Sequence, residues 1–314
     1  MDADPEARQP LDAETLRARR EGVRRKRRLR RRRSGLGLAG LAVLAAAVLV
    51  SQAAGGGSGA ARPVATASHS LAQPPAQAAA LTRLIGLGLP VYCAGNRGNR
   101  VALTFDDGPG PYTRIAIGEL RRARVRTTWF LVGRNLAGHE SLVGQERQLG
   151  VLADHTWTHR SLPTLSAEEA GVEMSHTQTS LAALGGRAVQ LFRPPYGARN
   201  PETDAEAKRL GMVEVLWNVD SEDSAGADKR GIARNVIAGL RPGSIVLMHE
   251  NRGQTIAALR RILPALHRRH LRGVSLPELL SADPPSDAQL RAGPRGCHLY
   301  GSAAAGLRAG RGRS

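Results

Sequence analysis

The sequence predicts an α/β fold in which helices cover a parallel sheet, and three observations support this prediction. Short β-branched or apolar runs alternate with longer segments of helical apolar spacing, which favours parallel strands. Polar motifs follow several of the expected strands directly, where barrel enzymes place their sites. The alternating region is roughly 190 residues long, which is enough to bury one substantial core.

The expected strands are short runs rich in apolar and β-branched residues, and Gly, Pro or acidic residues follow most of them. In chain order they cover residues 100–105, 127–132, 189–192, 212–219, 244–248 and 274–276.

The expected helices have helical apolar spacing or clear start and stop signals. They cover 115–122, a polar stretch after 133, then 166–184, 201–210, 231–240, 255–267 and a short final turn. The signals are strongest for 166–184, because Ser166 and Glu169 match a capping box and Gly185-Gly186 follows.

The net charge of +18 is concentrated near the N-terminus, where residues 17–33 hold 12 Lys and Arg. An uncharged run rich in Leu, Val and Ala, residues 35–50, follows directly. A basic block before an apolar run is typical of a membrane-targeting segment whose positive side stays in the cytoplasm. We therefore expect a basic cytoplasmic N-region at 1–34 and a signal peptide or signal-anchor helix at 35–54.

Two other interpretations of the basic block are open. Arg-rich segments also bind nucleic acid, but no aromatic residues for base stacking are interleaved here and an apolar run follows. We therefore expect no nucleic-acid partner. The charge is also partly explained by a composition rich in Ala, Arg and Gly throughout, in which case it has no partner at all.

Small and polar residues flank the expected folded region 91–282 on both sides. Residues 55–90 are rich in Ala, Gly, Ser, Pro and Gln, which predicts a flexible linker. Residues 283–314 are poor in large apolar residues, which predicts a low-complexity tail. Cys93 lies just inside the N-terminal boundary of this region, and Cys297 lies outside its C-terminal boundary. A disulfide between them is permitted if the chain is exported, and two free thiols are the alternative.

Two adjacent carboxylates, Asp106 and Asp107, follow the first expected strand in the run Thr-Phe-Asp-Asp-Gly-Pro. Adjacent side chains at a turn can point in different directions, so one can bind a metal while the other faces water beside it. The alternative is that Asp-Asp-Gly-Pro only makes a turn.

Two imidazoles, His155 and His159, are four residues apart, a spacing that fits one face of a helical turn and two ligands of one cation. Taken alone, such a pair is more often found on the surface. With Asp107 it forms a set of two His and one carboxylate, which suits Zn²⁺ first, and Co²⁺ or another first-row metal as alternatives. A divalent metal in such a site lowers the pKa of water toward about 7.

Three further motifs follow later strands. They are Arg193-Pro194-Pro195-Tyr196, the run from Trp217 to Asp223 with its carboxylates, and Leu247-Met248-His249. Together with the first two motifs they supply metal ligands, a base and an acid, which are the groups of a metal-assisted hydrolase.

In order and content these five motifs resemble those of the polysaccharide deacetylases of carbohydrate esterase family 4, the NodB-like homology domain, over residues 98–282. The resemblance implies a distorted (β/α) barrel and metal-dependent removal of N- or O-acetyl groups from polysaccharides. By position, it implies Asp107, His155 and His159 as metal ligands. It also implies Asp106 as the catalytic base and Arg193 as the residue that orients this base.

The later motifs are assigned in the same way. His249 matches the catalytic acid, and Asp223 matches the carboxylate that tunes it. Tyr196 matches the residue whose backbone N–H helps to hold the oxyanion. The resemblance places Leu247 beside the acetyl methyl group, and we group Trp217 with the residues that contact substrate.

Two positions depart from the family pattern. Ser224 follows Asp223 where the family usually has Trp, and Asp154 precedes the His pair where Asn is common. The first departure opens one wall of the expected sugar groove, and the second either is harmless or adds charge near the metal.

The sequence therefore predicts an exported or membrane-tethered monomer that removes acetyl groups from a glycan, with peptidoglycan or chitin-like oligosaccharides as the expected substrates. The alternatives are a catalytically weak or inactive glycan-binding domain of the same fold and an O-acetyl esterase of the xylan type.

Overall fold

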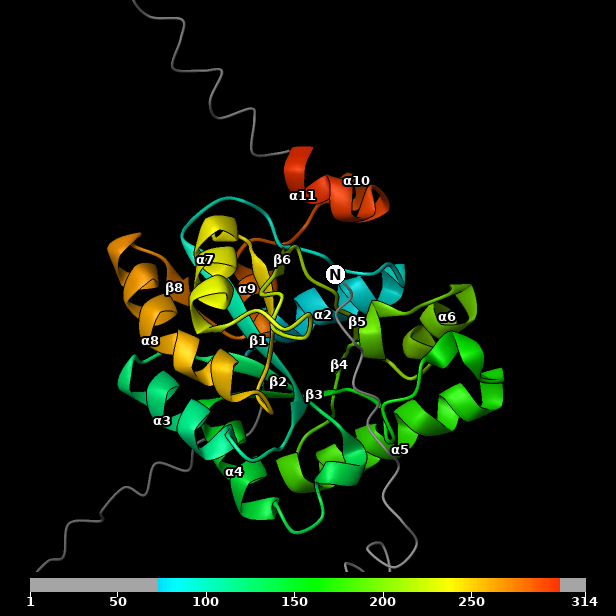
Figure 1. Ribbon diagram of the computed structural model, residues 1–314. Helices are drawn as coiled ribbons and strands as arrows, with labels where there is room; N and C mark the ends of the chain where they lie inside the picture. The colour runs from blue at the N-terminus through cyan, green and yellow to red at the C-terminus, as the bar shows by residue number, and fades with distance from the viewer. Residues whose placement is uncertain (1–72, 300–314) are drawn as a thin grey trace, which may run out of the picture. The chain divides into compact units, whose positions relative to one another are not determined.

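The computed structural model describes residues 73–299 (Figure 1). The predicted N-region at 1–34, the predicted membrane-targeting segment at 35–54, the first part of the predicted linker and residues 300–314 lie outside the described residues. Within 73–299, no helix combines the length and the apolar character that crossing a membrane requires.

A single parallel sheet forms the centre of the described region, with eight strands between residues 73 and 299. The hydrogen-bonded order is β5-β4-β3-β2-β1-β7-β6, and β8 pairs with β1 beside this path. The strands are β1 (Arg100–Gly108), β2 (Thr127–Leu131), β3 (Gly150–Asp154), β4 (Leu191–Phe192), β5 (Val213–Glu214), β6 (Val219–Asp220), β7 (Ile245–His249) and β8 (Arg272–Gly273).

The two ends of the strand path, β5 and β6, are separated in the chain only by residues 215–218. The sheet therefore curls back toward itself, and the described region is a distorted (β/α) barrel, as the sequence predicted. The expected strand 212–219 is wrong as one unit, because its first half pairs with β4 and its second half with β7. Because the two halves pair with different strands, they form two separate strands, β5 and β6.

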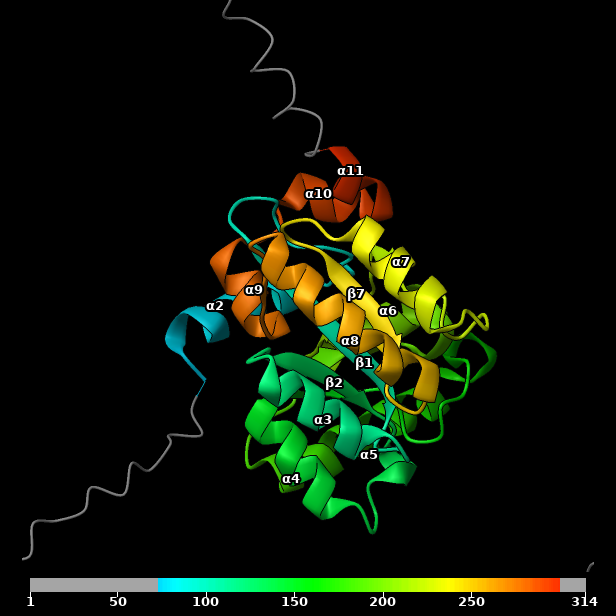
Figure 2. The same ribbon diagram turned by 60° about the vertical axis from the view of Figure 1, so that its left-hand side comes forward.

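Helices cover the outside of the sheet (Figures 1 and 2). In sequence order α3, α4, α5 and α6 pack one against the next, and α8 packs against both α3 and α7. The helices are α2 (Pro75–Leu87), α3 (Thr113–Arg122), α4 (Glu140–Leu149), α5 (Ala167–Gly185), α6 (Pro201–Arg209), α7 (Lys229–Gly239), α8 (Gly253–Arg268), α9 (Leu276–Ala282), α10 (Asp287–Arg291) and α11 (Gly296–Leu299). The capping box of α5 at Ser166 and its end at Gly186 confirm the sequence prediction.

The alternation of side chains along β1 separates two apolar clusters. Val101, Leu103 and Phe105 belong to the cluster between the sheet and the outer helices, whereas Ala102 belongs to the inner cluster. Because successive side chains of a strand face opposite sides, Thr104 and Asp106 also face inward. The first strand therefore carries a carboxylate into the interior of the barrel.

Two strand predictions differ from the structure. Sequence analysis missed β3, which begins at Gly150 directly after α4 and pairs with β2 over five residues. Its start has a glycine because a Cβ there would lie 2.2 Å from the Thr127 carbonyl oxygen, so the close strand contact excludes a side chain. The last strand, β8, lies at Arg272–Gly273 instead of 274–276.

The predicted flexible linker at 55–90 is wrong for its second half. Residues Pro75–Leu87 form α2, which packs against α9, as Figure 2 shows. Leu81 and Leu84 are buried there, and Gly88 ends the helix in the left-handed conformation. The Ala-rich composition that suggested a linker also favours a helix once Leu side chains have a surface to cover.

The predicted low-complexity tail is likewise wrong for residues 283–299. They form α10, a 3₁₀ turn η4 (Gly293–Arg295) and α11, and the structure joins Cys93 to Cys297 by a disulfide. The Gln289 amide donates to the Ala94 carbonyl at 2.9 Å, and Leu290 is buried beside it. The folded region therefore extends on both sides of the predicted boundaries.

Loss of the disulfide is expected to destabilise the fold. The two cysteines are 204 residues apart, and a bond closing so long a loop contributes about 2–5 kcal/mol when strain is small. The Cys93→Ser/Cys297→Ser variant should unfold at lower denaturant concentration than the oxidised parent, with Ser281→Ala as a control that changes no cysteine. Non-reducing peptide mapping that finds both thiols free in the exported protein would contradict the pairing.

Candidate active site and metal centre

All five sequence motifs meet at one end of the barrel, where β1, β3, β4, β6 and β7 terminate. This follows from the parallel topology, because the carboxyl ends of parallel strands lie at the same edge. Asp106 and His249 are register partners on the neighbouring strands β1 and β7. The structure thus brings the two expected acid–base groups side by side.

A β-bulge separates the roles of the two adjacent carboxylates. The register of β1 against β2 shifts between Asp106 and Gly108, and Asp107 has φ of 71°, in the left-handed region. A bulge inserts one unpaired residue and redirects its side chain. Asp106 is therefore buried, while the half-buried Asp107 turns toward the two histidines.

The predicted helical turn for His155 and His159 is wrong, because residues 155–160 form an irregular loop after β3. The two rings still approach each other, since Thr156 and His159 take positive φ of 66° and 62° and fold the loop tightly. Asp107 Oδ1 lies 3.7 Å from His155 Nε2 and 3.2 Å from His159 Nε2.

These three side chains fit one divalent metal. Each offers a ligand atom, and all three atoms lie within 4.8 Å of one another. Ligands about 2.0–2.2 Å from a tetrahedral zinc lie roughly 3.3–3.6 Å apart, and the Asp107 distances of 3.2 and 3.7 Å lie just below and just above this range. His155 Nδ1 lies 2.8 Å from the Arg193 carbonyl, which only accepts, so Nδ1 carries the proton and Nε2 presents its lone pair.

The charges of the three side chains also suit a cation. Burial, against the opposing charges of Asp106 and Asp107, lowers the pKa of His155 and favours the neutral ring that a metal needs. Burial alone would raise the pKa of Asp107, but the hydrogen bond and charges of the neighbouring imidazoles lower it well below its usual range. Asn251 donates to Asp107 Oδ2 at 3.1 Å, which leaves Oδ1 for the histidines.

Arg193 holds Asp106 in place. The arginine is fully buried, and its Nη1 donates to Asp106 Oδ1 at 2.7 Å and to Thr104 Oγ1 at 2.8 Å. The other Asp106 oxygen lies 3.6 Å from His155 Nε2. Arg193 therefore holds one oxygen of the carboxylate that is expected to be the base. The other oxygen points toward the expected metal ligands.

The same guanidinium ties the site to the barrel. Its Nε and Nη2 donate to the carbonyls of Val215 and Leu216 at 3.0 and 3.1 Å, in the link between β5 and β6. Its central carbon, Cζ, lies 4.1 Å from the centre of the Phe130 ring and 5.6 Å from that of the Trp217 ring. Trp217 in turn donates from Nε1 to Asp220 at 3.0 Å, so it forms part of the wall around the arginine.

His249 and Asp223 form a second polar unit. His249 Nδ1 lies 2.7 Å from Asp223 Oδ1, and the His249 backbone N–H donates to Oδ2 at 2.8 Å. Thr255 also donates to Oδ2, at 2.6 Å. Burial disfavours the charged His249 ring, but the Asp223 hydrogen bond and the charges of Asp106, Asp223 and Asp107 outweigh it and raise the pKa of His249.

The remaining expected residues lie in the same region. Tyr196 has φ of 63° in the 3₁₀ turn η3 (Pro195–Gly197), and its ring centre is 4.8 Å from that of His159. Its side chain is 71% exposed, so it faces solvent at the rim of the site. Leu247 on β7 is nearly fully buried beside Thr104 of β1, to which it is paired.

The strained backbone is concentrated at this site. Within residues 73–299, seven residues other than glycine have positive φ, and five of them belong to the motif loops. These five are Asp107, Thr156, His159, Tyr196 and Glu222. Each such conformation costs about 1–3 kcal/mol and persists only where surrounding contacts enforce it, which is typical of functional sites.

Sequence reasoning missed several residues that support the site. Asn251, Thr255 and Glu250 all follow the His249 motif closely, but nothing in their spacing signals a role. Glu250 is fully buried under Gly108, where a Cβ would lie 1.5 Å from Glu250 Oε1, so only glycine fits after Asp107. Burial raises the pKa of Glu250 to about 7, and Thr113 donates to its other oxygen.

Asp154, where the family commonly has Asn, adds little negative charge near the expected metal ligands. Asp154 is fully buried, and its Oδ1 accepts from the Thr156 N–H at 2.7 Å. Burial, helped by the charge of Glu173, raises the pKa of Asp154 well above its usual range and so favours the neutral acid. A neutral carboxyl resembles the amide of Asn. The other departure, Ser224, is exposed beside Asp223.

A hollow next to the metal ligands offers space for a large substrate. It opens to solvent and has a volume of about 490 Å³. Its lining comes from the loops after β1, β2 and β7: Asp107, Pro109, Gly110, Pro111, Arg134, Asn135, Ala137, His139 and Asn251.

Three side chains that could hold a divalent metal lie beside the buried Asp106 carboxylate and the half-buried His249 at the carboxyl ends of barrel strands, an arrangement typical of metal-assisted hydrolases. Comparison with known proteins agrees, since the family model described as polysaccharide deacetylase matches residues 94–215. A chitooligosaccharide deacetylase of Rhizobium leguminosarum bv. trifolii is 34% identical over 207 residues, which are 60% of this chain and 96% of that protein. The chain therefore belongs to the polysaccharide deacetylase family.

The match covers different shares of the other relatives' own length. A peptidoglycan-N-acetylglucosamine deacetylase of Bacillus cereus is 32% identical over 57% of this chain and 67% of its own length. A bifunctional xylanase/xylan deacetylase of Cellvibrio japonicus is 34% identical over 48% of this chain, but the match spans only 23% of that protein. The solved structure of a family 4 carbohydrate esterase from Streptomyces lividans with acetate has 34% identity and a TM-score of 0.54. The match covers 56% of this chain and 92% of that one.

The ligand assignment predicts the metal content of variants. The parent should hold about one equivalent of divalent metal, and the His155→Ala/His159→Ala variant should lose it because only Asp107 remains. The His267→Ala/His270→Ala variant removes two exposed histidines instead and should keep the metal. Elemental analysis of the dialysed proteins distinguishes these results, and equal retention in both double variants would refute the site.

Proposed function

We propose that this chain hydrolyses acetyl groups from an acetylated glycan, with the N-acetyl groups of peptidoglycan or chitin-like oligosaccharides as substrate. The observation that carries the proposal is the placement of the buried Asp106 and the half-buried His249 on neighbouring strands, beside the cluster of Asp107, His155 and His159. The names of the Rhizobium and Bacillus relatives support the choice of glycan.

A divalent metal held by Asp107, His155 and His159 would polarise the acetyl carbonyl and acidify water. Zinc is the metal we propose first, because two imidazoles and one carboxylate suit it, and Co²⁺ or another first-row metal is the alternative. This chain's own residues would carry the protons and position the substrate.

Asp106 accepts a proton from the attacking water, because its free oxygen faces the cluster while Arg193 holds the other. The water oxygen bonds to the acetyl carbon, and the Tyr196 backbone N–H stabilises the negative oxygen. His249 then protonates the sugar nitrogen as the carbon–nitrogen bond breaks. Acetate and a free amine leave, and Leu247 borders the space for the acetyl methyl group.

The His249–Asp223 contact suits the acid role. The raised pKa of His249 extends to higher pH the range in which the ring is protonated and can donate from Nε2, while Asp223 binds Nδ1. The same arrangement would protonate an oxygen leaving group, and an O-acetyl esterase activity is the alternative within this mechanism.

We further propose that the chain acts outside the cytoplasm as a monomer, anchored by residues 35–54 or released after their cleavage, without a nucleic-acid partner. The glycan substrates named for the relatives support an extracytoplasmic site of action. A reporter fused after residue 80 tests this location directly.

The division of labour predicts the effect of two substitutions. Asp106→Asn removes the proton acceptor and His249→Ala removes the donor, while both leave the metal ligands in place. Each should reduce acetate release by roughly 10²- to 10⁴-fold with metal content unchanged, and the losses should not multiply in the double variant if the groups act together.

Acetate release from acetylated chitooligosaccharide and peptidoglycan fragments measures this prediction, with chelator as a negative control. Near-parental activity of Asp106→Asn would remove the base assignment, and loss of metal would make Asp106 a ligand. A parent that binds these glycans but releases no acetate would establish the inactive glycan-binding alternative.

The Asp223 contact also predicts a pH dependence. An acid must be protonated, so activity should fall as pH rises through the pKa of His249. Asp223→Asn removes the hydrogen-bond partner that contributes most to raising this pKa, so the alkaline limb of kcat/KM should move down by roughly 1–3 pH units. Glu222→Gln removes an exposed carboxylate from the same loop and should leave the limb in place. If the alkaline limb of kcat/KM lies at the same pH in Asp223→Asn as in the parent, the assignment of Asp223 as the carboxylate that tunes His249 is contradicted.

A further inference from the structure

Two arginine-rich segments meet at the end of the barrel opposite the active site. One runs from the end of α3 to β2, residues 121–126, and the other from the end of α8 to β8, residues 268–272. The Arg126 backbone N–H donates to the Gly273 carbonyl at 3.3 Å, and a Cβ on Gly273 would lie 2.5 Å from Val125 Cγ1. The two segments therefore lie side by side at the amino ends of β2 and β8, strands that both pair with β1.

These two segments contain seven arginines and no acidic residue. Glu119, the acid nearest in sequence to the first segment, is paired with Arg122 and Arg260, and residues 251–277 contain no Asp or Glu. Within residues 73–299, the six other arginines of the segments form no ion pair, and all six are exposed. We call these six residues the basic face: Arg121, Arg124, Arg126, Arg268, Arg269 and Arg272.

The basic face is a local feature, because other exposed surfaces carry both signs of charge. The first turn of α5 exposes Glu168 and Glu169, and α6 exposes Glu202 as well as Lys208. A surface region with charges of one sign creates a potential that attracts the opposite sign, whereas mixed charges largely cancel. The basic end of the barrel is therefore suited to an anionic partner.

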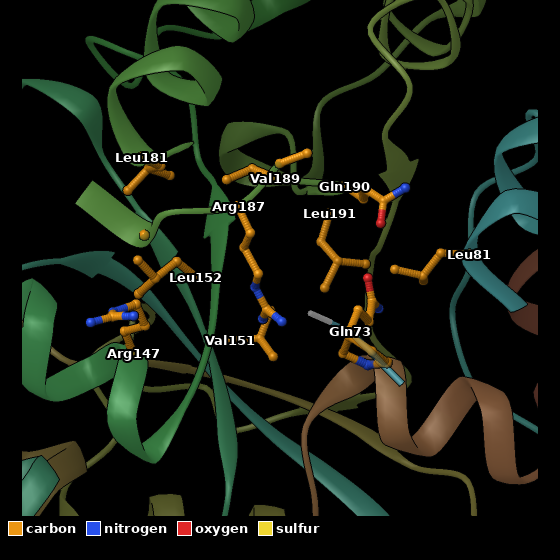
Figure 3. Close-up of a pocket in the computed structure, with 13 residues that line it drawn as sticks. Gln73, Leu81, Arg147, Val151, Leu152, Leu181, Arg187, Val189, Gln190 and Leu191 are labelled. Atoms are coloured by element: carbon orange, nitrogen blue, oxygen red, sulfur yellow. The ribbon is translucent and has the colours of Figure 1, made fainter. Parts of the chain in front are cut away.

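The chain enters the described region at this same end. Burial, together with the charges of Arg126 and Arg147, lowers the pKa of Arg187, so these three arginines lie within electrostatic range of one another. Figure 3 shows Gln73, the first described residue, lining one hollow with Arg187 and Arg147. From there α2 continues and packs on α9, on the side of the barrel from which β7 starts (Figure 2).

The sequence before α2 identifies the anionic partner that is held nearest to this end. We expect a membrane-targeting segment at 35–54, and 20 residues, 55–74, lie between it and α2. A chain of this length spans at most about 70 Å when fully extended. An anchor at 35–54 therefore attaches the bilayer to the end of the barrel that carries the basic face.

We propose that the basic face contacts the anionic headgroups of the bilayer in which the chain is anchored. This contact rests on the anchored location proposed above and is independent of the deacetylase chemistry. An arginine close to an anionic membrane strengthens binding by about fivefold, and the attraction falls off within a Debye length of about 8 Å at physiological salt. Nucleic acids and other polyanions have the same charge, but the anchor keeps only the membrane beside this face.

The contact gives the active site a defined orientation. The basic face lies at the amino ends of the strands, and the expected metal ligands and acid–base groups lie at their carboxyl ends. A domain that rests on the bilayer through the basic face therefore points its substrate hollow away from the membrane. A glycan outside the membrane then reaches the site without competing with lipid headgroups.

Arginine-specific labelling of the full chain in vesicles tests the contact. Phenylglyoxal modifies accessible guanidinium groups, and mass spectrometry reports the rate at each arginine. Arg121, Arg124 and Arg272 should react at least about fivefold more slowly in phosphatidylglycerol vesicles than in phosphatidylcholine vesicles, and high salt should remove the difference. Arg134 and Arg230 are exposed near the active-site end and should react equally in both vesicles.

A triple variant separates the basic face from the anchor and the basic N-terminus, which it leaves unchanged. In Arg124→Gln/Arg268→Gln/Arg272→Gln, the protection of Arg121 and Arg126 by phosphatidylglycerol should be lost. The matched control, Lys229→Gln/Arg230→Gln/Arg234→Gln, removes three exposed charges of α7 and should keep this protection.

Several results would overturn the proposal. They are equal labelling of the basic face in both kinds of vesicle, equal protection in the two triple variants, and failure of the full chain to associate with either vesicle. Protection by soluble polyphosphate without protection by phosphatidylglycerol would assign a polyanionic polymer instead of the membrane. Acetate release by the same vesicles is measured separately, so a parent that shows protection but no deacetylation refutes the proposed function and leaves the membrane contact standing.

Discussion

The buried guanidinium of Arg193 is the constraint on which the other parts of the active site depend. It donates to Asp106 and Thr104 of β1 and to the carbonyls of Val215 and Leu216 between β5 and β6. Its own carbonyl accepts from His155. One residue therefore connects the expected base, an expected metal ligand and the link that curls the sheet into a barrel.

A buried charge of this kind is expensive unless every donor is satisfied. Four of the five N–H groups of Arg193 have acceptors, which are one carboxylate, one hydroxyl and two carbonyls, and the face of the Phe130 ring lies against the guanidinium. The residues that accept from it belong to different strands, so they are held in one arrangement. The positive-φ residues at and around the expected metal ligands are strained, and such conformations persist only where the surrounding contacts enforce them.

The sequence predicted the features that depend on local pattern. The order of the motifs at strand ends placed all ten expected site residues in one region, because parallel strands fix where their ends meet. The capping box of α5 was likewise visible in Ser166 and Glu169. The disulfide between Cys93 and Cys297 was an open choice in the sequence, and the structure forms it.

The features that sequence analysis missed depend on distant contacts. The loop of His155 and His159 is not helical because positive φ at two residues, enforced by the surrounding fold, brings the rings together. Thr255 and Asn251 gain their roles only from the approach of α8 and its preceding loop to Asp223 and Asp107. Helix α2 was taken for a linker because the partner that buries Leu81 and Leu84, helix α9, lies about 190 residues further along.

A double-mutant cycle on Arg193 and Asp106 tests the central claim most directly. Arg193→Met and Asp106→Leu each leave the other charge buried and unpaired, a loss that typically costs about 3–5 kcal/mol. The double variant should therefore lose less unfolding free energy than the two single variants lose together, and the difference should exceed about 1 kcal/mol. Additive losses within about 0.5 kcal/mol would show that the two residues act independently and would contradict the account.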